Sequence, residues 1–453
     1  MVSFRMAVSK GYGENMSSVL IEKINLRSAT IAVIGLGYVG LPLAVEQAKT
    51  GFAVAGIDKD IRKLEQINSG KSYIRDVPGD DVRALVESGK LRVHHQPAPL
   101  KEADIIVICV PRPLKTMKQP DLSFVISATR EVAGQLQVGQ LISLESTTFP
   151  GTTQEVILPI LESGGLVVGK DFFLSFSPER VDPGNKCFTT GDISKVVGGI
   201  TALCRDVACA FYGQTHKQVV PVSSPAAAEM TKIFENTYRS VNIAMVNEFM
   251  LLCDRMGLDI WEVVDAAATK PFGIQTFYPG PGVGGHCIPV DPVYLAWKAR
   301  EYDFNTRFID LAGEINIKAS EHVVQKLTTT LNKHKKCLNG SRILLLGVAY
   351  KKDIDDVRES PALKIIDFLQ KSQADVVYHD PYVPKLRLSD NDQACLQSTD
   401  LLSGEILRAD CVLILTDHTC IDYQWVVDHA KLVLDARNAT KHVTRGKKKI
   451  TKI

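Results

Sequence analysis

One cysteine lies in a segment whose composition suits covalent chemistry. Residues 279–292 read PGPGVGGHCIPVDP, in which only His286 separates Cys287 from a glycine-rich run. Glycines let a backbone approach a bound molecule closely and leave amides free to donate. A thiol in such a rigid, polar loop suits reaction as a thiolate, whereas most cysteines are inert core residues. The loop predicts a nucleophile at Cys287, with Asp291 orienting water or, alternatively, stabilising a turn.

Two polar residues share one face of a predicted helix. Lys232 and Asn236 are four residues apart in the segment from Ala226 to Met256, whose apolar residues recur with helical period and which contains no internal glycine or proline. A lysine and an amide on one face can stabilise a developing oxyanion. By spacing alone, the alternative is a solvated helix face.

A glycine fingerprint follows the first apolar strand. Thr30–Gly35 is β-branched and apolar, and Gly35-Leu-Gly37-Tyr38-Val39-Gly40 leads into helical sequence. The first glycine permits a tight turn, the second admits a pyrophosphate, and the third allows close packing of the helix on the strand. The pattern predicts a dinucleotide site, and the alternative is a plain turn in another α/β protein.

The cofactor choice depends on the end of the second predicted strand, Phe52–Ile57. Asp58 follows it, where a carboxylate accepts hydrogen bonds from the adenosine ribose and repels a 2′-phosphate. NAD is therefore predicted over NADP. Lys59 and Arg62 are nearby cations that could restore NADP binding.

The C-terminal third contains a second α/β pattern without the glycine fingerprint. Its first predicted strand, Ile343–Leu346, continues into the charged sequence GVAYKKDIDDVRES at 347–360. Sheets of this kind bind ligands beyond the carboxyl ends of their strands. We expect an anionic ligand there that is not a second dinucleotide.

These residues require three groups of elements to position them. Strands are expected at Thr30–Gly35, Phe52–Ile57, Asp104–Val110, Leu141–Leu144, Ile343–Leu346, Asp375–Tyr378, Cys411–Leu415 and Leu432–Leu434, and helices around Ser18–Ile24 and at Val39–Thr50, Ala226–Met256, Asp310–His334 and Pro361–Gln370. A loop is expected at Tyr278–Pro292. The predicted domains are a lead-in at 1–28, a doubly wound α/β domain at 29–222, a helical domain at 223–335 and an α/β domain at 336–453.

Composition excludes several other classes of protein. The 453 residues have a formal net charge of +2, which provides no general attraction to nucleic acid or a membrane surface. No apolar run reaches the roughly 18–20 residues that cross a bilayer. The ten cysteines include no CxxC pair, which argues against a disulfide framework or a zinc site. A reducing compartment, the cytoplasm, is expected.

Six motifs in order give the chain a resemblance to the UDP-glucose/GDP-mannose dehydrogenase family over nearly its whole length. They are GLGYVGLPLA, STTFPGTT at Ser146–Thr153, SPERVDPG at Ser177–Gly184, the Glu229–Asn236 helix, GGHCIPVDP and GVAYKKDIDDVRESPA. The resemblance implies an N-terminal Rossmann domain for NAD, a central helical domain like that of 6-phosphogluconate dehydrogenase, and a C-terminal Rossmann-like domain for UDP. It also implies a homodimer.

The resemblance implies oxidation of a sugar C6 alcohol through an aldehyde to a carboxylate. Cys287 forms a thiohemiacetal and then a thioester, with two NAD consumed. Lys232 and Asn236 stabilise oxyanions, and Glu179 and Asp291 manage water and protons. Thr147 or Thr148 lies near the nicotinamide. The remaining implied contacts are Pro111 for the cofactor, and Phe277, Tyr278, Gly284, Lys351 and Arg437 for the substrate, with Arg437 reaching across the dimer.

Two segments indicate the sugar. Residues 269–273 (TKPFG) and 277–282 (FYPGPG) look most like UDP-N-acetylglucosamine 6-dehydrogenases of polysaccharide biosynthesis, and the arginine common near Lys270–Phe272 in relatives that use UDP-glucose or UDP-N-acetylmannosamine is missing. Those two sugars remain alternatives. A single-step hydroxyacid or 6-phosphogluconate-type dehydrogenase leaves Cys287 and the C-terminal third unexplained. A non-catalytic nucleotide-sugar-binding protein would not need Cys287, Lys232 and Asn236 together.

Overall fold

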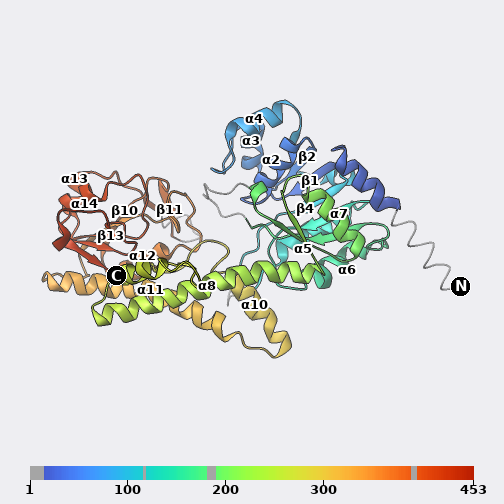
Figure 1. Ribbon diagram of the computed structural model, residues 1–453. Helices are drawn as coiled ribbons and strands as arrows, with labels where there is room; N and C mark the ends of the chain where they lie inside the picture. The colour runs from blue at the N-terminus through green and yellow to red at the C-terminus, as the bar shows by residue number, and fades with distance from the viewer. Residues whose placement is uncertain (1–14, 116–118, 181–189, 389–394) are drawn as a thin grey trace. The chain divides into compact units, whose positions relative to one another are not determined.

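The computed structural model describes residues 15–115, 119–180, 190–388 and 395–453 (Figure 1). The chain forms two compact units, Met1–Glu235 and Asn236–Ile453, and the long helix α8 (Pro225–Met256) contributes residues to both. Among the described residues, no helix is both long enough and apolar enough to cross a membrane. The three predicted domain boundaries, after residues 28, 222 and 335, remain predictions.

The first unit is built on an eight-stranded sheet with the order β3-β2-β1-β4-β5-β6-β7-β8. The strands are β1 (Thr30–Ile34), β2 (Ala53–Ile57), β3 (Leu91–His94), β4 (Ile105–Ile108), β5 (Leu141–Leu144), β6 (Phe173–Phe176), β7 (Lys195–Gly199) and β8 (Val219–Val222). All neighbouring strands are parallel except β6 and β7, which are antiparallel. Both faces are covered, so a strand such as β4, with sequence IIVI, is apolar throughout and fully buried.

Helices cover both faces of this sheet. Residues 15–25, α2 (Gly40–Thr50) and α7 (Ala202–Tyr212) pack into one core, and α5 (Ser123–Ala133) and α6 (Leu158–Glu162) pack into the other. The remaining helices of this unit are α3 (Ile61–Asn68), α4 (Gly79–Glu87), the π-helix η3 (Thr153–Ile157) and the short 3-10 turns η1 (Ala98–Lys101) and η4 (Thr190–Asp192). The strand order reverses between β1 and β4, and ligands bind at such a switch point, beyond the carboxyl ends of the strands.

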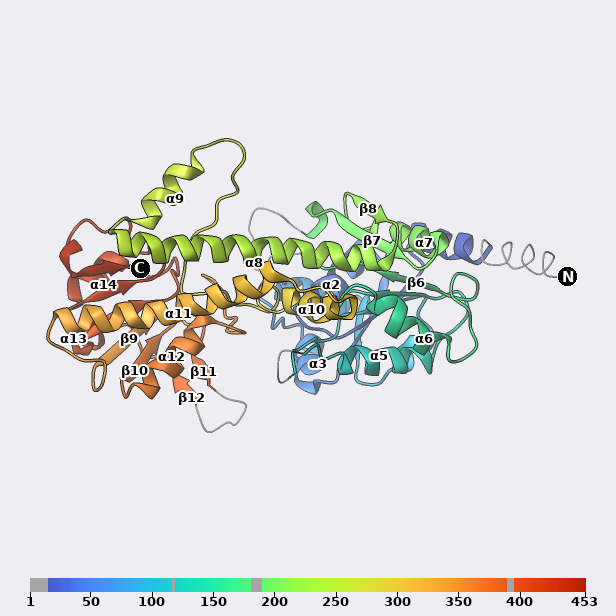
Figure 2. The same cartoon turned by 90° about the horizontal axis from the view of Figure 1, so that it is seen from below.

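The second unit combines long helices with a smaller sheet. Its helices are the remainder of α8, α9 (Ile260–Ala268), α10 (Asp291–Ala299) and α11 (Arg307–Lys333), with the 3-10 turn η5 (Arg300–Tyr302). Figure 2 shows α11 running alongside α8, and apolar residues of the two helices, among them Ala244 and Ile315, pack together.

The sheet of the second unit has the order β10-β9-β13-β14-β15, and all its strands are parallel. The strands are β9 (Arg342–Leu346), β10 (Asp375–His379), β13 (Cys411–Ile414), β14 (Val433–Asp435) and β15 (Ile450–Lys452), with a separate hairpin of β11 (Lys385–Arg387) and β12 (Cys395–Gln397). Helix α12 (Pro361–Lys371) packs with α11 on one face, and α13 (Ser403–Arg408) and α14 (Tyr423–His429) cover the other, while η6 (Lys447–Lys449) precedes β15.

The predicted fold class, two α/β parts with a helical part between them, is confirmed. One predicted boundary is wrong. The glycine-rich loop ends at Val290, because Asp291 and Pro292 form the first turn of α10. Proline is favoured in a first helical turn, where its missing N–H has no partner to lose. Strands β3, β6, β7 and β8 were not predicted individually.

Candidate active site

The glycine turn after β1 is shaped by close backbone contacts. Gly35 has a φ of +90°, and a Cβ there would lie 2.6 Å from the carbonyl oxygen of Cys109. A Cβ at Gly40, the first residue of α2, would overlap the carbonyl of Gly35. At Gly37, by contrast, a Cβ would meet no described atom within 4 Å. The turn is therefore packed on the protein side and open at Gly37, which suits the approach of a pyrophosphate. Tyr38 is 42% exposed beside this opening.

Asp58 lies at the end of β2, next to the glycine turn. Its Oδ2 accepts a hydrogen bond of 2.8 Å from the backbone amide of Leu36 and lies 3.1 Å from Nζ of Lys63. The two cations expected to compete for a 2′-phosphate have other partners. Arg62 pairs with Asp60 at 3.0 Å, and Lys59 pairs with Glu131 at 2.8 Å.

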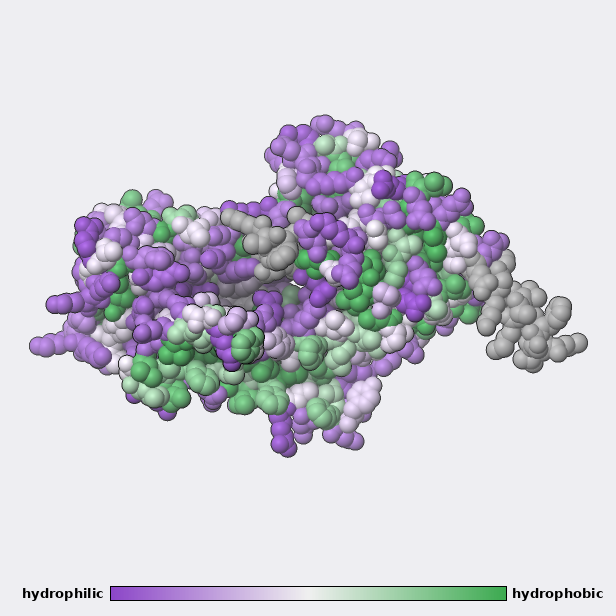
Figure 3. All heavy atoms as spheres, in the orientation of Figure 1, coloured by the Kyte–Doolittle hydropathy of each residue, from purple (hydrophilic) through white to green (hydrophobic). Residues whose placement is uncertain are grey.

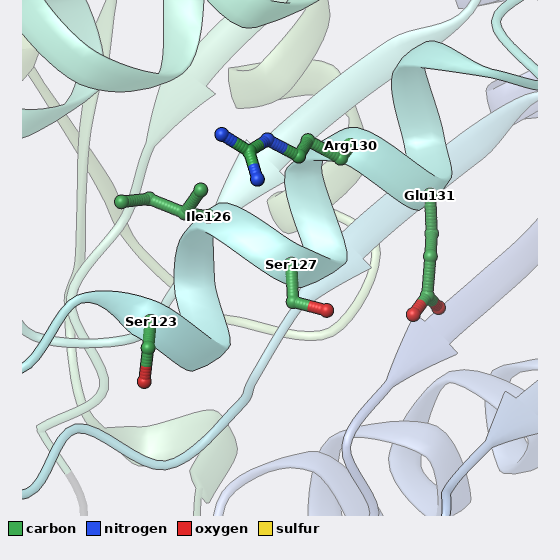
Figure 4. Close-up of a pocket in the computed structure, with 5 residues that line it drawn as sticks. All are labelled: Ser123, Ile126, Ser127, Arg130 and Glu131. Carbon is green, nitrogen blue, oxygen red and sulfur yellow. The ribbon is translucent and has the colours of Figure 1, made fainter.

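A hollow of about 550 Å³ lies over α5 (Figure 4). Its described lining consists of Ser123, Ile126, Ser127, Arg130 and Glu131, on one side of the helix. The ion pair between Glu131 and Lys59 joins this side of α5 to the residue after Asp58. Pro111, predicted to contact the cofactor, is exposed on the segment between β4 and α5.

Two threonines follow β5 at the same edge of the sheet. Thr147 is 6% exposed and Thr148 is fully buried. Among the described residues, Oγ1 of Thr148 has no hydrogen-bond partner. A buried hydroxyl without a partner is costly, and a bound molecule can supply that partner. With the open Gly37 and the carboxylate of Asp58, these residues fit a dinucleotide at this edge.

Glu229, from the motif predicted on α8, anchors the segment after β5. Its carboxylate accepts hydrogen bonds from the amide of Gly151 (2.6 Å) and from the amide and hydroxyl of Thr153 (2.9 and 2.6 Å). Burial raises the pKa of Glu229 above its ordinary value, although these three donors act in the other direction. Glu229 therefore has a structural role, connecting the STTFPGTT motif to α8.

Glu179 lies beyond the end of β6, at the same edge as the glycine turn. Its Oε1 accepts from the backbone amide of Arg180 (2.7 Å), and its Oε2 lies 3.3 Å from Nζ of Lys195. Sequence reasoning missed Lys195. The rest of the SPERVDPG motif, residues 181–184, lies outside the described residues.

Lys232 and Asn236 lie one turn apart on α8, as predicted, and are 8% and 3% exposed. The reading as a solvated helix face is therefore wrong, because both side chains are buried. Asn236 donates from Nδ2 to Oδ2 of Asp291 over 2.6 Å, and Asp291 is itself fully buried. Within the second unit the structure thus brings together two of the predicted catalytic residues.

Cys287 is joined by its backbone to the start of α10. Its carbonyl accepts hydrogen bonds from the amides of Val290 (3.1 Å) and Asp291 (2.8 Å), and its side chain is partly exposed. Asp291 therefore contacts the Cys287 segment through its amide and α8 through its carboxylate. The residue before α10, Val290, makes no side-chain cap.

The glycines before Cys287 permit close contact with the C-terminal sheet region. A Cβ at Gly284 would lie 2.5 Å from Cβ of Tyr350 and 2.9 Å from the carbonyl oxygen of Glu359. The amide of Gly285 donates to the carbonyl of Arg358 at 2.8 Å. Gly284, predicted to contact substrate, thus has a packing role that any side chain would prevent.

Three buried polar side chains that sequence reasoning missed hold the start of the loop. Asn247 on α8 accepts from the amide of Gly280 (3.0 Å) and donates to Asn316 on α11 (3.0 Å). Ser320, also on α11, donates to the carbonyl of Pro281 (2.6 Å). These residues could have been found from the sequence, because they are polar residues at core-facing positions of two otherwise apolar helices.

The two predicted aromatic substrate contacts also pack within the protein. Phe277 meets Tyr238 edge to face, with ring centroids 6.1 Å apart. Tyr278 stacks on Trp261 at 6.0 Å and donates its hydroxyl to Asp265 at 2.8 Å. These contacts hold the loop against α8 and α9.

Arg437 follows β14 and lies beside the glycine loop of its own chain. Its Nε is 3.3 Å from Asp417, and a Cβ at Gly280 would lie 2.6 Å from its Nη1. The guanidinium is therefore placed near the Cys287 loop within a single chain. Whether it also reaches a partner chain stays a prediction.

Lys351 lies in the charged segment after β9. The start of this segment is fixed by Asp380, whose Oδ2 accepts from the amides of Val348 (2.7 Å) and Ala349 (3.1 Å) and lies 3.1 Å from Nε2 of His418. Burial opposes the charge of Asp380, but the hydrogen bonds from His418 and the backbone prevail, so its pKa lies below the ordinary value. This anionic anchor holds the loop that carries Lys351.

Comparison with known proteins agrees with this three-part layout. Residues 29–216 match the NAD binding domain of the UDP-glucose/GDP-mannose dehydrogenase family, residues 226–318 match its central domain, and residues 344–442 match its UDP binding domain. The chain is 35% identical over 423 residues to the UDP-N-acetyl-D-mannosamine dehydrogenase of Pyrococcus horikoshii, covering 92% of this chain and 97% of the relative.

Two further similarities cover most of the chain. The UDP-N-acetyl-D-glucosamine 6-dehydrogenase of Pseudomonas aeruginosa is 35% identical over 364 residues, which is 79% of this chain and 84% of the relative. A solved structure of the UDP-D-ManNAc dehydrogenase from Pyrococcus horikoshii has a TM-score of 0.85 at 33% identity, covering 94% of this chain and 99% of that one.

Proposed function

The chain belongs to the UDP-glucose/GDP-mannose dehydrogenase family, and from this premise we propose that it oxidises C6 of UDP-N-acetylglucosamine to the uronate in two steps at Cys287. It is an NAD-dependent UDP-sugar dehydrogenase by family. The observation that supports the two-step proposal is the setting of Cys287. Its carbonyl accepts a hydrogen bond from the amide of Asp291, and the carboxylate of Asp291 accepts one from the side chain of Asn236.

The residues of the chain have separate tasks in this proposal. Bound NAD supplies the hydride acceptor, once for each of two oxidations. The Cys287 thiolate adds to the C6 aldehyde, forming a carbon–sulfur bond while the oxygen takes a proton. Oxidation of this thiohemiacetal gives a thioester, and water then cleaves the carbon–sulfur bond to release the carboxylate and restore the thiol.

Four further side chains are assigned to charge stabilisation and proton transfer in these steps. Lys232 and Asn236 donate to the oxygen on which negative charge develops. Asp291, held by Asn236, and Glu179, held by Lys195, orient water and accept its proton. Covalent attachment prevents the reactive aldehyde from leaving between the two oxidations.

The diphosphate end of the substrate is assigned to the second unit. Lys351 and Arg437 both follow strands of the five-stranded sheet, at its carboxyl edge, and Arg437 suits bidentate contact with phosphate. Phe277, Tyr278 and Gly284 shape the loop that faces the sugar. Binding and chemistry are thus assigned to different residues, which makes them separable by mutation.

The sugar assignment is supported by the segments 269–273 and 277–282 and by the N-acetylated sugars in the names of the relatives. UDP-N-acetylmannosamine is the second candidate, because the similar enzyme of Pyrococcus horikoshii, matched both by sequence and by structure, is named for it. An N-acetyl group requires a pocket for its methyl and partners for its amide, so a site built for it discriminates against UDP-glucose.

The test is a panel of UDP-N-acetylglucosamine, UDP-N-acetylmannosamine, UDP-N-acetylgalactosamine and UDP-glucose with NAD. We expect the highest kcat/KM for UDP-N-acetylglucosamine and two NADH for each uronate formed. A higher kcat/KM for another sugar overturns the substrate, whereas one NADH per sugar with free aldehyde as the product overturns the covalent mechanism.

We also propose that the enzyme is a homodimer, formed through α8. Large apolar side chains are exposed along this helix at helical spacing: Met230, Phe234, Tyr238, Met245, Phe249, Leu252 and Met256. Figure 3 shows hydrophobic surface gathered in a band on the face of the molecule drawn there. A continuous exposed apolar stripe of this kind favours association. Light scattering should give twice the chain mass, and Phe249→Glu should halve it while Phe124→Glu on α5 does not. A monomeric wild-type protein overturns this proposal.

We place the enzyme in the cytoplasm. Every cysteine within the described part of the chain is a free thiol, which is typical of a reducing compartment. Fractionation of cells of the source organism should recover the enzyme with cytoplasmic markers, and recovery with secreted proteins contradicts the assignment.

A further inference from the structure

A buried ion network lies at the carboxyl edge of the eight-stranded sheet, and no step proposed above uses all of it. Lys195 is 2% exposed, and its Nζ lies 3.0 Å from Oε2 of Glu145 and 3.3 Å from Oε2 of Glu179. Tyr212 on α7 donates its hydroxyl to Oε1 of Glu145 (2.7 Å). Its hydroxyl also bonds to Ser143 on β5 (2.8 Å).

The antiparallel strand β7 brings the lysine to this edge. The carboxyl ends of β5 and β6 carry Glu145 and Glu179, and a parallel neighbour would start at the opposite edge. Because β7 runs antiparallel to β6, its first residue, Lys195, lies at the edge where β5 and β6 end. The ladder of β6 and β7 ends with the pairing of Phe176 and Gly198, and three residues further along each strand the side chains of Glu179 and Lys195 form the ion pair of 3.3 Å.

The network has one open end. The side chains of Glu145 and Lys195 are 0% and 3% exposed, whereas that of Glu179 is 17% exposed. Burial of unpaired charge is costly, so a lysine buried between two carboxylates is held in place by both. The member of the network that reaches the solvent-facing edge is the carboxylate assigned to water and protons.

We propose that Lys195 is a positioning residue for Glu179: it fixes the Glu179 carboxylate at the sheet edge in the ionised form from which it accepts a proton. This inference rests on the proposed function, because it requires that Glu179 acts as an ionised group in the reaction. An opposite charge within a few ångströms favours the ionised form of a carboxyl group. Glu145 weakens this effect, because it shares the lysine and carries a like charge.

The titratable groups facing this network come from several elements. Arg180, which follows Glu179, pairs with Glu235 on α8 at 2.6 Å. Cys109 after β4 and His216 after α7 also interact electrostatically with Lys195. Burial acts to lower the pKa of Lys195, but the charges of Glu145 and Glu179 prevail and raise it, so the lysine stays protonated across the range of an assay.

The experiment compares pH profiles of kcat/KM for wild type, Lys195→Met, Lys195→Arg and Glu145→Gln. Removing the cation disfavours the ionised form of Glu179, so the acid limb of the Lys195→Met profile should move to higher pH by about one unit or more. Lys195→Arg should keep the wild-type limb. In Glu145→Gln the charge of Lys195 acts on Glu179 without the competing charge of Glu145, so the acid limb of this variant's pH profile should move to lower pH. Shifts of the acid limb in opposite directions for Lys195→Met and Glu145→Gln distinguish an electrostatic role of Lys195 from a general loss of structure.

Two controls complete the test. Lys217→Met removes an exposed lysine that pairs with Asp192, and its profile should match wild type. In a Glu179→Gln background, Lys195→Met should produce no further shift. If Lys195→Met fails to fold, as thermal melting will show, Glu145→Gln still decides the question. An unmoved acid limb in folded, active variants overturns the role of Lys195, whereas a wild-type protein that oxidises no UDP-sugar overturns the proposed function instead.

Discussion

Asn236 on α8 donates a hydrogen bond of 2.6 Å to the carboxylate of Asp291, 55 residues away at the start of α10, and both side chains are buried. The amide of Asp291 donates in turn to the carbonyl of Cys287. The side chain proposed to stabilise the oxyanion, the carboxylate proposed to orient water and the nucleophile are thus connected by two hydrogen bonds. Loss of the Asn236 side chain should therefore disturb Asp291 and, through it, the Cys287 segment.

Asn236→Ala should reduce kcat by about 100-fold, because it removes an oxyanion donor and one of the contacts that position the Asp291 carboxylate. It should also destabilise the protein by about 1–3 kcal/mol, since a buried acceptor loses a hydrogen bond. Asn242→Ala is the control, because that amide bonds the Tyr238 carbonyl on the same helix. Steady-state rates and denaturant unfolding measure both effects. A kcat within about threefold of wild type argues against the oxyanion role.

Cofactor choice should follow Asp58. With Arg62 paired to Asp60 and Lys59 paired to Glu131, we expect NAD to exceed NADP in kcat/KM by at least about tenfold, which corresponds to about 1.4 kcal/mol. Asp58→Asn keeps an acceptor for the Leu36 amide but removes the charge, so the preference should narrow. Equal efficiency of the wild-type enzyme with both cofactors would show that Lys63 or another cation accommodates the phosphate.

The limits of sequence reasoning are clear at this site. Helical spacing placed Lys232 and Asn236 on one face correctly, because residues four apart on a helix are always neighbours. The contact between Asn236 and Asp291 could not be predicted, because it depends on how two helices pack. Tyr278 was predicted to contact substrate from its motif alone. The structure adds its stacking on Trp261, a contact that spacing does not reveal.

In the sheets, too, some strands could be predicted from the sequence and others could not. Strands such as β1, β4 and β9 were predicted from continuous apolar runs, since strands buried on both faces carry that signal. Strand β7 (KVVGG) was not predicted, because it begins with a charged residue and ends in two glycines. Its antiparallel direction is a property of the sheet, and that direction is what places Lys195 beside Glu179.

Stability should depend on pH through His216. Burial, followed by the charge of Lys195, lowers the pKa of His216 to about 4. In the unfolded chain the ring titrates at about 6.5, so below that pH the unfolded state binds more protons. The neutral, buried ring therefore stabilises the fold above pH 6.5, and this stabilisation is lost as the pH falls toward 4. At pH 5 the loss in the free energy of unfolding is about 2 kcal/mol.

This contribution is measured by denaturant unfolding at pH 7.5 and pH 5.0. Between these two pH values, the free energy of unfolding of His216→Gln should fall by about 2 kcal/mol less than that of the wild type. His442→Gln, at an exposed position, controls for the removal of a histidine. The same loss in wild type and His216→Gln would contradict the assignment.

The central claim is that Cys287 is the covalent nucleophile of the second oxidation, and Cys287→Ser tests it most directly. Serine keeps the shape of the site, but a hydroxyl is far less acidic and a far weaker nucleophile than a thiol. Affinity for the UDP-sugar, measured by calorimetry, should stay near the wild-type value, because the diphosphate is assigned to Lys351 and Arg437. Product mass spectrometry should show uronate formation reduced by at least about 100-fold. Near-normal production of the uronate by Cys287→Ser would show that Cys287 is a structural loop residue and would contradict the mechanism.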